Sequence, residues 1–456
     1  MDTLRHSTGN IAAMKITHIA CIAALFAVAG CQGSGNDRPP PSYVNYFDAA
    51  PNLEAVEFRR EQDFTNPVRL SYALGAARTR YDSGQYDFHL AYSTVNPDAQ
   101  EVDFSETLSP DQVYTFVAVA PNGQPEVLKF AVDALPNPTT QRFTLIHAFE
   151  GLGDLDVYWE APGTILSSAV PIGTISFGQD PLPFEVVPGT YRLFLTTAGD
   201  PNDVLFESSN QTIVEGPDRV VDDVFVVSDP AGQVTVNLIV SRVGYSRLGQ
   251  DGVRSNVRVI QSINDGVDRD IYVDDTTSPP LFPAQPFGVI SDYAEVDFGT
   301  RVVLATPVGN PGTEELSYPY SAISGGVHTV LIATDSQGEI AAASILEDKR
   351  SIVGQATMTF FDGAGLFGDI YIYAVPPGTD ITTLDPQLVM FAPGFSSRLP
   401  VTPGDYELWV KDGTTSAILA GPEAITVEDG GVYGIGFVNG AGGSTVDLVL
   451  YDDFIP

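Results

Sequence analysis

Cysteine is scarce in this sequence, and positive charge is scarce relative to negative charge. Its two cysteines, Cys21 and Cys31, both lie near the start of the 456 residues, so no disulfide holds the body of the chain together. Each domain therefore has to be stable on its hydrophobic core. Lysine and arginine number 22 against 58 aspartates and glutamates, a formal net charge of −36. Because nucleic-acid affinity comes from basic residues that neutralise phosphates, nucleic acid is not an expected partner.

The acidic excess leaves three interpretations open. Self-repulsion keeps a protein soluble, the charge adapts it to a salty exterior, or the carboxylates bind divalent cations loosely. Three lysines follow residue 30, namely Lys129, Lys349 and Lys411.

Apolar runs with helical spacing are also missing beyond the N-terminus. Short runs rich in Val, Ile, Tyr, Phe and Thr alternate with turns that draw on 43 glycines and 34 prolines. Such runs between turn residues are typical of strands. With 43% hydrophobic residues the chain is globular rather than disordered. The sequence therefore predicts an all-β protein.

The N-terminal apolar run is the exception. Residues 14–30 (MKITHIACIAALFAVAG) begin with a positive charge and end in small residues. A run of about a dozen apolar residues predicts a secretion signal rather than a spanning helix, with translation starting at Met1 or Met14. Val28-Ala29-Gly30-Cys31 resembles the lipobox of bacterial lipoproteins, where Leu is commoner than Val at the first position. The resemblance implies lipidation of Cys31; the alternative is an ordinary signal peptide with an incidental cysteine.

The residues after Cys31 indicate where the anchor sits. Gln32 is not the aspartate that resembles an inner-membrane retention signal, so we expect the outer membrane. Several acyl chains anchor stably where one alone is marginal. Residues 33–41 (GSGNDRPPP) are typical of a polar spacer that stiffens at its prolines.

Three landmarks recur four times in the same order. The clearest copy of the first is the strand phrase Leu155-Asp156-Val157-Tyr158-Trp159. Its other copies start at Val56, Asp270 and Asp369. The second landmark is a glycine that opens a new alternating run, at Gly84, Gly189, Gly299 and Gly404. The third lies 29 to 31 residues later, at Tyr114, Val220, His328 and Tyr433. A period of roughly 100 residues predicts a duplicated domain.

The landmarks divide the chain into four tandem Ig-like antiparallel β-sandwiches, each with its own core, like beads on a string. The expected segments are a signal peptide at 1–30, lipidated Cys31 and linker at 31–42, repeats at 43–136, 140–240, 256–349 and 352–456, and a linker at 241–255.

Three stretches of the second repeat, 142–148 (RFTLIHA), 156–158 (DVY) and 187–191 (VPGTY), resemble the bacterial domain-of-unknown-function family numbered 4397. The likeness is partial in repeats three and four and faint in repeat one. The family's proline-bearing loop is replaced here by residues 149–153, and the position of His147 holds Asp48 or Gln261 in other repeats. The resemblance implies a secreted or surface-anchored β-domain and carries no catalytic residues.

Candidate catalytic residues are few. His89, His147 and His328 fall in three separate repeats with no closely spaced pair, so the sequence predicts no metal site. His89 is expected on a solvent-facing strand surface with Asp87. Residues 363–368 (GAGLFG) match the dinucleotide fingerprint as letters, but a strand follows where that fingerprint needs a helix. No cofactor is predicted.

Carboxylate pairs are numerous near the expected strand ends, namely Asp154/Asp156, Asp222/Asp223, Asp268/Asp270 and Asp274/Asp275. They are either solvated turn residues or ligands of at least one Ca²⁺ ion, and the sequence leaves both open.

Four aromatic residues alternate away from the inferred core, namely Tyr158, Tyr272, Tyr371 and Trp409. They are expected to form a ligand-facing surface unless neighbouring strands or domains cover them. Our leading hypothesis is a non-enzymatic outer-membrane lipoprotein that acts as a surface scaffold or adhesion module. Its partners would be the membrane, through the lipid on Cys31, and other envelope proteins or polysaccharide. The alternatives are a carbohydrate-binding module and, more remotely, a glycan hydrolase that uses two acids.

Overall fold

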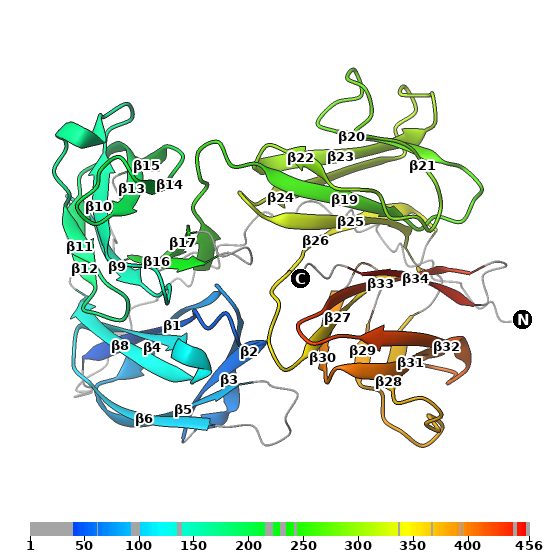
Figure 1. Cartoon of the computed structure of the whole chain (residues 1–456), viewed down its shortest axis with the longest axis horizontal. Helices are drawn as coiled ribbons and strands as arrows, with labels where there is room; N and C mark the ends of the chain where they lie inside the picture. Colours follow the sequence, from blue (N-terminus) through cyan, green and yellow to red (C-terminus); the bar gives the residue numbers. More distant parts are fainter. Residues whose placement is uncertain are drawn as a thin grey trace, which may run out of the picture. The chain divides into compact units, whose positions relative to one another are not determined.

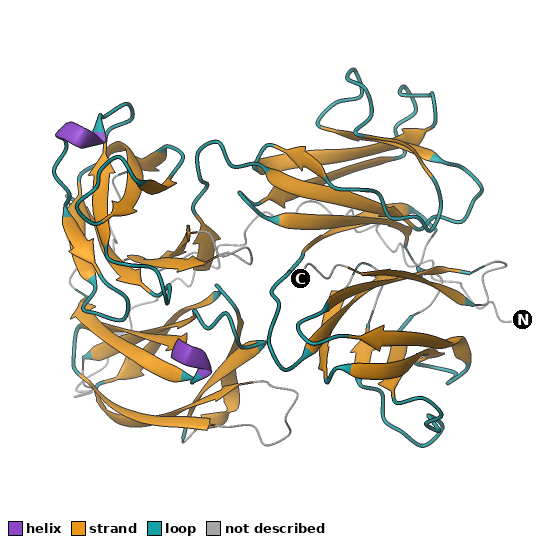
Figure 2. Ribbon diagram, viewed as in Figure 1, coloured by secondary structure: helices purple, strands orange, loops and turns teal. Residues whose placement is uncertain are grey.

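The structure is a computed structural model of the whole chain. It describes residues 40–61, 63–92, 101–134, 139–214, 222–228, 234–240, 244–335, 338–365, 368–391, 394, 396–440 and 445–452. The predicted signal peptide, Cys31 and most of the spacer lie outside these residues. Within them the chain consists of strands and loops, with two single-turn 3₁₀ helices at Pro121–Gly123 (η1) and Leu166–Ser168 (η2), as Figure 2 shows.

The strands group into four consecutive repeats. Repeat 1 contains β1(Pro41–Asp48), β2(Ala55–Arg60), β3(Asp63–Ser71), β4(Gly75–Asp82), β5(Gly84–Tyr92), β6(Glu101–Leu108), β7(Gln112–Val119) and β8(Glu126–Asp133). Repeat 2 contains β9(Gln141–His147), β10(Leu155–Glu160), β11(Gly173–Ile175), β12(Leu182–Val186), β13(Gly189–Thr197), β14(Val204–Glu207), β15(Gln211–Ile213), β16(Asp222–Ser228), β17(Val234–Val240) and β18(Gly244–Arg247).

Repeat 3 contains β19(Ser255–Gln261), β20(Arg269–Val273), β21(Phe282–Gln285), β22(Ala294–Val296), β23(Gly299–Pro307), β24(Leu316–Ala322), β25(Val327–Thr334) and β26(Ile340–Leu346). Repeat 4 contains β27(Ala356–Gly363), β28(Ile370–Val375), β29(Leu388–Met390), β30(Ser396–Val401), β31(Gly404–Asp412), β32(Ile418–Val427), β33(Val432–Asn439) and β34(Val446–Asp452).

All four repeats share one topology of two facing sheets (Figure 1). One sheet, which we call the mixed sheet, pairs the first strand of the repeat in parallel with the first strand of the closing hairpin, as β1 with β7 and β27 with β33. The other, the antiparallel sheet, is ordered β3-β2-β5-β6 in repeat 1 and β29-β28-β31-β32 in repeat 4. The prediction of tandem β-sandwiches is therefore confirmed. Part of the predicted linker is wrong, because β18 lies inside 241–255 and extends the mixed sheet of repeat 2.

The glycine landmark opens the same strand in every repeat. β5, β13, β23 and β31 each begin at that glycine and are each nine residues long. At Gly299 the backbone φ is +107°, a conformation that side chains with a Cβ rarely adopt.

In three repeats the side chain at the third landmark accepts a hydrogen bond from the turn before its strand, and we call this contact the corner. Tyr114 accepts a hydrogen bond from the backbone N of Ser109 at 2.8 Å, and Tyr433 accepts one from Glu428 at 2.8 Å. His328 Nε2 does the same with the backbone N of Ile323 at 3.2 Å. Val220 lies outside the described residues. The register instead places Asp222 opposite Phe143, as Tyr114 lies opposite Val44.

The sequence-based alignment of the strand phrase in repeat 4 is wrong by two residues. Leu155 and Ile370 each pair with the last residue of the nine-residue strand, Thr197 and Asp412. Three residues further on, Tyr373 is therefore the counterpart of Tyr158, and the predicted Tyr371 lies two residues too early. A shift of two residues keeps every side chain on the same face of a strand, so alternation alone does not reveal it.

A buried polar residue is the last or next-to-last residue of the first strand in each repeat. Asp48 accepts a hydrogen bond from the backbone N two residues later at 2.9 Å, and His147, Gln261 and Asp362 do the same in the other repeats. All four side chains are buried. The second carboxylate oxygens of Asp48 and Asp362 lack a hydrogen-bond partner among the described residues. Burial raises the pKa of Asp48 to about 7 and that of Asp362 to about 6.

Each repeat encloses an apolar cluster between its two sheets, but the repeats are not independent beads. Phe47 of repeat 1 stacks on Phe225 of repeat 2 with ring centroids 3.8 Å apart, inside an apolar cluster shared by their mixed sheets. Ile260 of repeat 3 and Phe361 of repeat 4 share a similar cluster. The beads-on-a-string prediction is therefore wrong. The mixed sheets bury both faces, as the unbroken burial of β16 and β33 also shows.

Repeat 1 also contacts the segment between repeats 3 and 4. The guanidinium of Arg350 donates to the carbonyl oxygens of Pro51 and Leu53 at 3.0 and 2.8 Å, and lies 4.6 Å from the ring centroid of Tyr72. Arg398 of β30 pairs with Glu54 at 2.7 Å. These contacts link parts of the chain that are about 300 residues apart in sequence.

Candidate functional site

The sequence predicts a ligand-binding surface on the outer face of the antiparallel sheet. In repeat 2 another segment of the chain covers this face. Tyr158 is 2% exposed and packs with Phe194 and with Leu166 of η2. η2 belongs to the long connection between β10 and β11, which folds over this face. Tyr272 of repeat 3 is 4% exposed. The prediction that Tyr158 and Tyr272 face a ligand is wrong, because alternation gives the face of a strand and not what covers it.

In repeat 4 the corresponding face is half covered. Tyr371 and Trp409 are half-buried around a cluster of Tyr373, Val375 and Ile381. The Nζ of buried Lys411 donates to the carbonyl of Ile381 at 2.7 Å and lies 4.7 Å from the ring centroid of Tyr373. A lysine thus fastens the connection between β28 and β29 onto the aromatic rings.

Repeat 1 differs at this face. Two residues separate β2 from β3, so the connection between these two strands is too short to cross the sheet. The register places Arg59 opposite His89, where repeat 2 has Tyr158 opposite Phe194. An arginine and a histidine therefore replace an aromatic pair.

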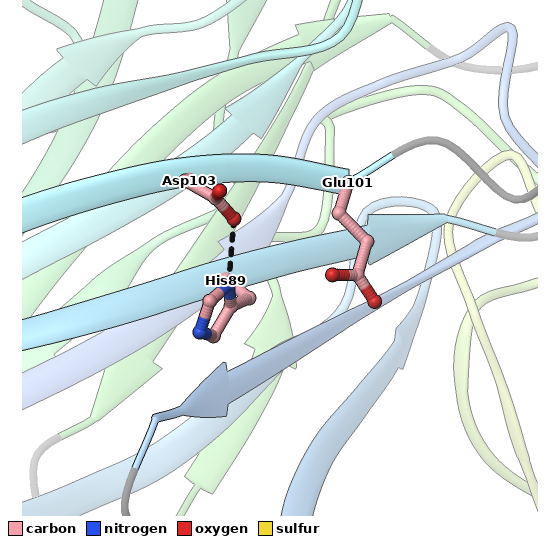
Figure 3. Close-up of side chains that lie close together, drawn as sticks. All are labelled: His89, Glu101 and Asp103. Carbon is pink, nitrogen blue, oxygen red and sulfur yellow. Dashed lines mark hydrogen bonds and ion pairs between the residues drawn. The ribbon is translucent and has the colours of Figure 1, made fainter.

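His89 on β5 and the acids Glu101 and Asp103 on β6 form a cluster on this face. His89 lies opposite Asp103 in register, and Glu101 precedes Asp103 by two residues, so all three side chains project from the same side. His89 Nδ1 lies 2.6 Å from Asp103 Oδ1, and Figure 3 shows the carboxylate of Glu101 beside the same imidazole. One ligand atom from each residue lies within 4.8 Å of the other two. The histidine is partly buried, whereas both acids are exposed.

An ion-pair network borders the cluster. Arg59 pairs with Glu57 and reaches Glu101 at 3.4 Å, and Arg69 pairs with Glu57 from β3. Burial alone would raise the pKa of the Glu57 carboxyl, but the hydrogen bonds from the two arginines outweigh burial and hold it below its usual range. Arg59 is thus shared between Glu57 and Glu101.

The other two histidines among the described residues have structural roles. His147 Nε2 lies 3.1 Å from the carbonyl of Gly153, while its Nδ1 accepts from the backbone N of Phe149 at 3.3 Å. Burial lowers the pKa of His147, and it lowers that of His328 to about 4. Both imidazoles are therefore neutral at pH 7.

The carboxylate pairs predicted near strand ends are bound mainly by the chain's own donors. Asp156 accepts from Thr174 Oγ1 at 2.6 Å and from the backbone N of Gly199 at 2.7 Å. Asp270 accepts from the backbone N of Ala284 and Gly309 in the same manner. The others that accept hydrogen bonds from the chain are Asp222, Asp223, Asp274 and Asp275. These carboxylates fasten turns and sheets to one another.

A cavity of about 350 Å³ lies where repeats 2 and 3 join. Its lining includes Phe206, Arg247, Arg254 and a single carboxylate, Glu295. Arg254 lies 3.6 Å from Glu295 and 3.1 Å from Asp297. The two facing acids of a glycan hydrolase are therefore not present in this cavity.

Two further sequence motifs find their place in the fold. β27 ends at Gly363 of the glycine-rich run, and the next element is the strand β28, which does not fit a dinucleotide site. The predicted lipidation site Cys31 lies outside the described residues. Among the residues that are described, no helix has the length and apolar character needed to span a bilayer.

Sequence reasoning missed the His89 cluster because it weighed histidine pairs alone. The available signal was a Glu-x-Asp triplet on the strand that follows a histidine-bearing strand. Its use requires the β5–β6 register, which short-range alternation does not supply.

Comparison with known proteins assigns no family to this chain. No protein-family model matches it, and no curated protein matches it. The resemblance to family 4397 stays a prediction. Among solved structures, the Bacillus anthracis TIE protein matches at 9% sequence identity, over 88% of this chain and 68% of that chain, with a TM-score of 0.16. A likeness at that TM-score carries no argument about fold or function.

Proposed function

We propose that this chain is a non-enzymatic lipoprotein of the bacterial outer membrane that serves as a surface scaffold or interaction module. The observation that carries the proposal is the lipobox-like Val28-Ala29-Gly30-Cys31, followed by four copies of one sandwich. Lipidation at Cys31 would tether repeat 1 through the polar spacer.

The packing of the repeats supports a scaffold role. The mixed sheets of repeats 1 and 2 bury an apolar cluster between them, and those of repeats 3 and 4 bury another. Arg350 and Arg398 add polar contacts to repeat 1. Such contacts oppose free rotation between domains, which suits a protein that holds partners at defined positions.

One exposed apolar surface supports the interaction role. The connection between β10 and β11 carries Ile165, Val170 and Ile172, which are 70%, 78% and 40% exposed. Aliphatic side chains grouped on one exposed connection are typical of contact surfaces for another protein. The proposed partner at this connection is an envelope protein.

The test of the anchor uses the two cysteines as a matched pair. Cys31→Ser should move the protein from the outer-membrane fraction to the soluble fraction, whereas Cys21→Ser, inside the predicted signal, should leave its location unchanged. Metabolic labelling with a fatty acid should mark the wild type and Cys21→Ser alone. Labelling that persists in Cys31→Ser would contradict the anchor.

The test of the interaction role is cross-linking and pull-down from intact cells, combined with protease shaving. Ile165→Ser with Val170→Ser should lose partners that the wild type captures. If the wild type and the double variant capture the same partners, the β10–β11 connection is not the contact surface.

The carbohydrate-binding alternative retains only Tyr371 and Trp409 of its predicted aromatic residues. A glycan array separates it from the scaffold proposal. Binding that disappears in Trp409→Ala would favour the alternative, and a blank array would count against it.

A further inference from the structure

We propose that His89, Glu101 and Asp103 form a surface binding site for a first-row divalent cation such as Zn²⁺. The ligand set is one imidazole and two carboxylates, which these cations accept and which leaves a position open for water or a partner's ligand. The proposal concerns repeat 1 and is independent of the lipid anchor.

The backbone places the three ligands before any cation arrives. Neighbouring strands hold His89 and Asp103 as a directly opposed pair, and the two-residue period of β6 keeps Glu101 on the same face. Strand positions are more rigid than loop positions, so little ordering remains for binding to accomplish.

The observed distances suit a single ion after small side-chain movements. Ligands at about 2.0–2.2 Å from one Zn²⁺ lie roughly 3 to 4 Å from each other. In the structure the three ligand atoms lie within 4.8 Å of one another. The hydrogen bond of 2.6 Å between His89 Nδ1 and Asp103 Oδ1 is shorter than that spacing, so a shared ion has to displace the proton between them and move the two atoms apart. Glu101 and Asp103 have side chains that are 46% and 76% exposed, so they are free to rotate toward a shared ion.

The other repeats supply an independent argument. The positions equivalent to His89, which is the sixth residue of β5, hold Phe194, Leu304 and Trp409. These three residues belong to faces that are buried or half-buried. Repeat 1 alone combines a short β2–β3 connection with ligating side chains at this face. A duplicated sandwich that only needed stability at this place would keep the covered apolar pair.

Arg59 is expected to weaken cation binding at this site. Its guanidinium lies 3.4 Å from Glu101 and repels a cation at that distance. It also pairs with Glu57, so Glu57 retains it when a cation takes Glu101. Removal of Arg59 should therefore strengthen binding, whereas removal of a ligand weakens it.

The experiment is a calorimetric titration of the full chain in detergent with Zn²⁺ alone. The wild type should bind with an affinity at least about tenfold higher than His89→Gln and Asp103→Asn, since even residues that only support a ligand contribute this much. Arg59→Gln should bind more tightly than the wild type. Asp87→Asn is the matched control, because it removes the same charge from the same face of β5 without removing a ligand.

Equal affinities of the wild type and His89→Gln would overturn the proposal and leave only adventitious binding by surface acids. Equal losses in Asp103→Asn and Asp87→Asn would overturn it as well, since net charge would then explain the effect. Neither result bears on the proposed lipid anchor, which is tested separately by the membrane fractionation of Cys31→Ser.

Discussion

Repeat 1 and repeat 2 use the same sheet in opposite ways. In repeat 2 the antiparallel sheet carries Tyr158 opposite Phe194, and η2 covers the pair. In repeat 1 the same two positions are Arg59 and His89, and two residues join β2 to β3. The inner face of both sheets is core. The length of one connection therefore decides whether the outer face is a second apolar layer or a charged surface.

The largest expected effect on stability comes from truncating the side chains at these two equivalent positions, Tyr158 and Arg59. Tyr158→Ala should destabilise repeat 2 by about 3 kcal/mol, because it removes a buried aromatic ring and leaves a cavity. Arg59→Ala should cost less than about 1 kcal/mol, because its partners are surface ion pairs. Urea unfolding followed for each variant checks both. Similar shifts in the urea midpoint would break the comparison.

A second effect comes from the buried polar position near the end of the first strand. Asp362 is buried, and its pKa is raised to about 6 from an ordinary 3.8. The unfolded chain loses this proton first as the pH rises, so the contribution of Asp362 to stability is full below about pH 4 and is lost between about pH 4 and pH 6. Asp362→Asn should remove that loss and raise the free energy of unfolding by up to about 3 kcal/mol at pH 8.

Repeat 3 already contains the control for this change, because Gln261 is an uncharged amide at the equivalent position. Gln261→Glu should introduce the pH dependence that Asp362→Asn removes. Unfolding curves at pH 4 and pH 8 measure both. Identical stability of Asp362→Asn and the wild type at pH 8 would show that the buried acid is compensated.

The smallest effect concerns the corner in repeats 1 and 4. Tyr433→Phe removes the hydrogen bond from the backbone N of Glu428 and should destabilise repeat 4 by about 1 kcal/mol. Tyr114→Phe should cost the same in repeat 1, since Ser109 makes the equivalent contact. A difference between the two well above that amount, measured by thermal unfolding, would mean that the corners are not equivalent.

Two errors show where sequence reasoning ended. Tyr371 was aligned with Tyr158 although Tyr373 is its counterpart, and the third landmark of repeat 2 was placed at Val220 although Asp222 holds the equivalent register. Both are displacements of two residues, and alternation repeats every two. The pairing of the repeats had a visible signal, because Val224-Phe225-Val226-Val227 is an unbroken apolar run typical of a strand buried on both faces.

The candidate site depended on pairing that no local pattern encodes. Glu101 and Asp103 follow His89 by 12 and 14 residues, and only the β5–β6 register brings them together. In the same way, Arg350 reaches the carbonyl oxygens of Pro51 and Leu53 although it lies about 300 residues later in the sequence.

By itself the sequence determined the all-β class, the four copies and the glycine that opens one strand in each, because turn chemistry and alternation act between neighbouring residues. The tertiary structure alone decided which sheet faces are covered, which repeats pack together and which side chains lie close to His89 in repeat 1. Those outcomes depend on strand register and on the path of connections, which are set by burial across the whole fold.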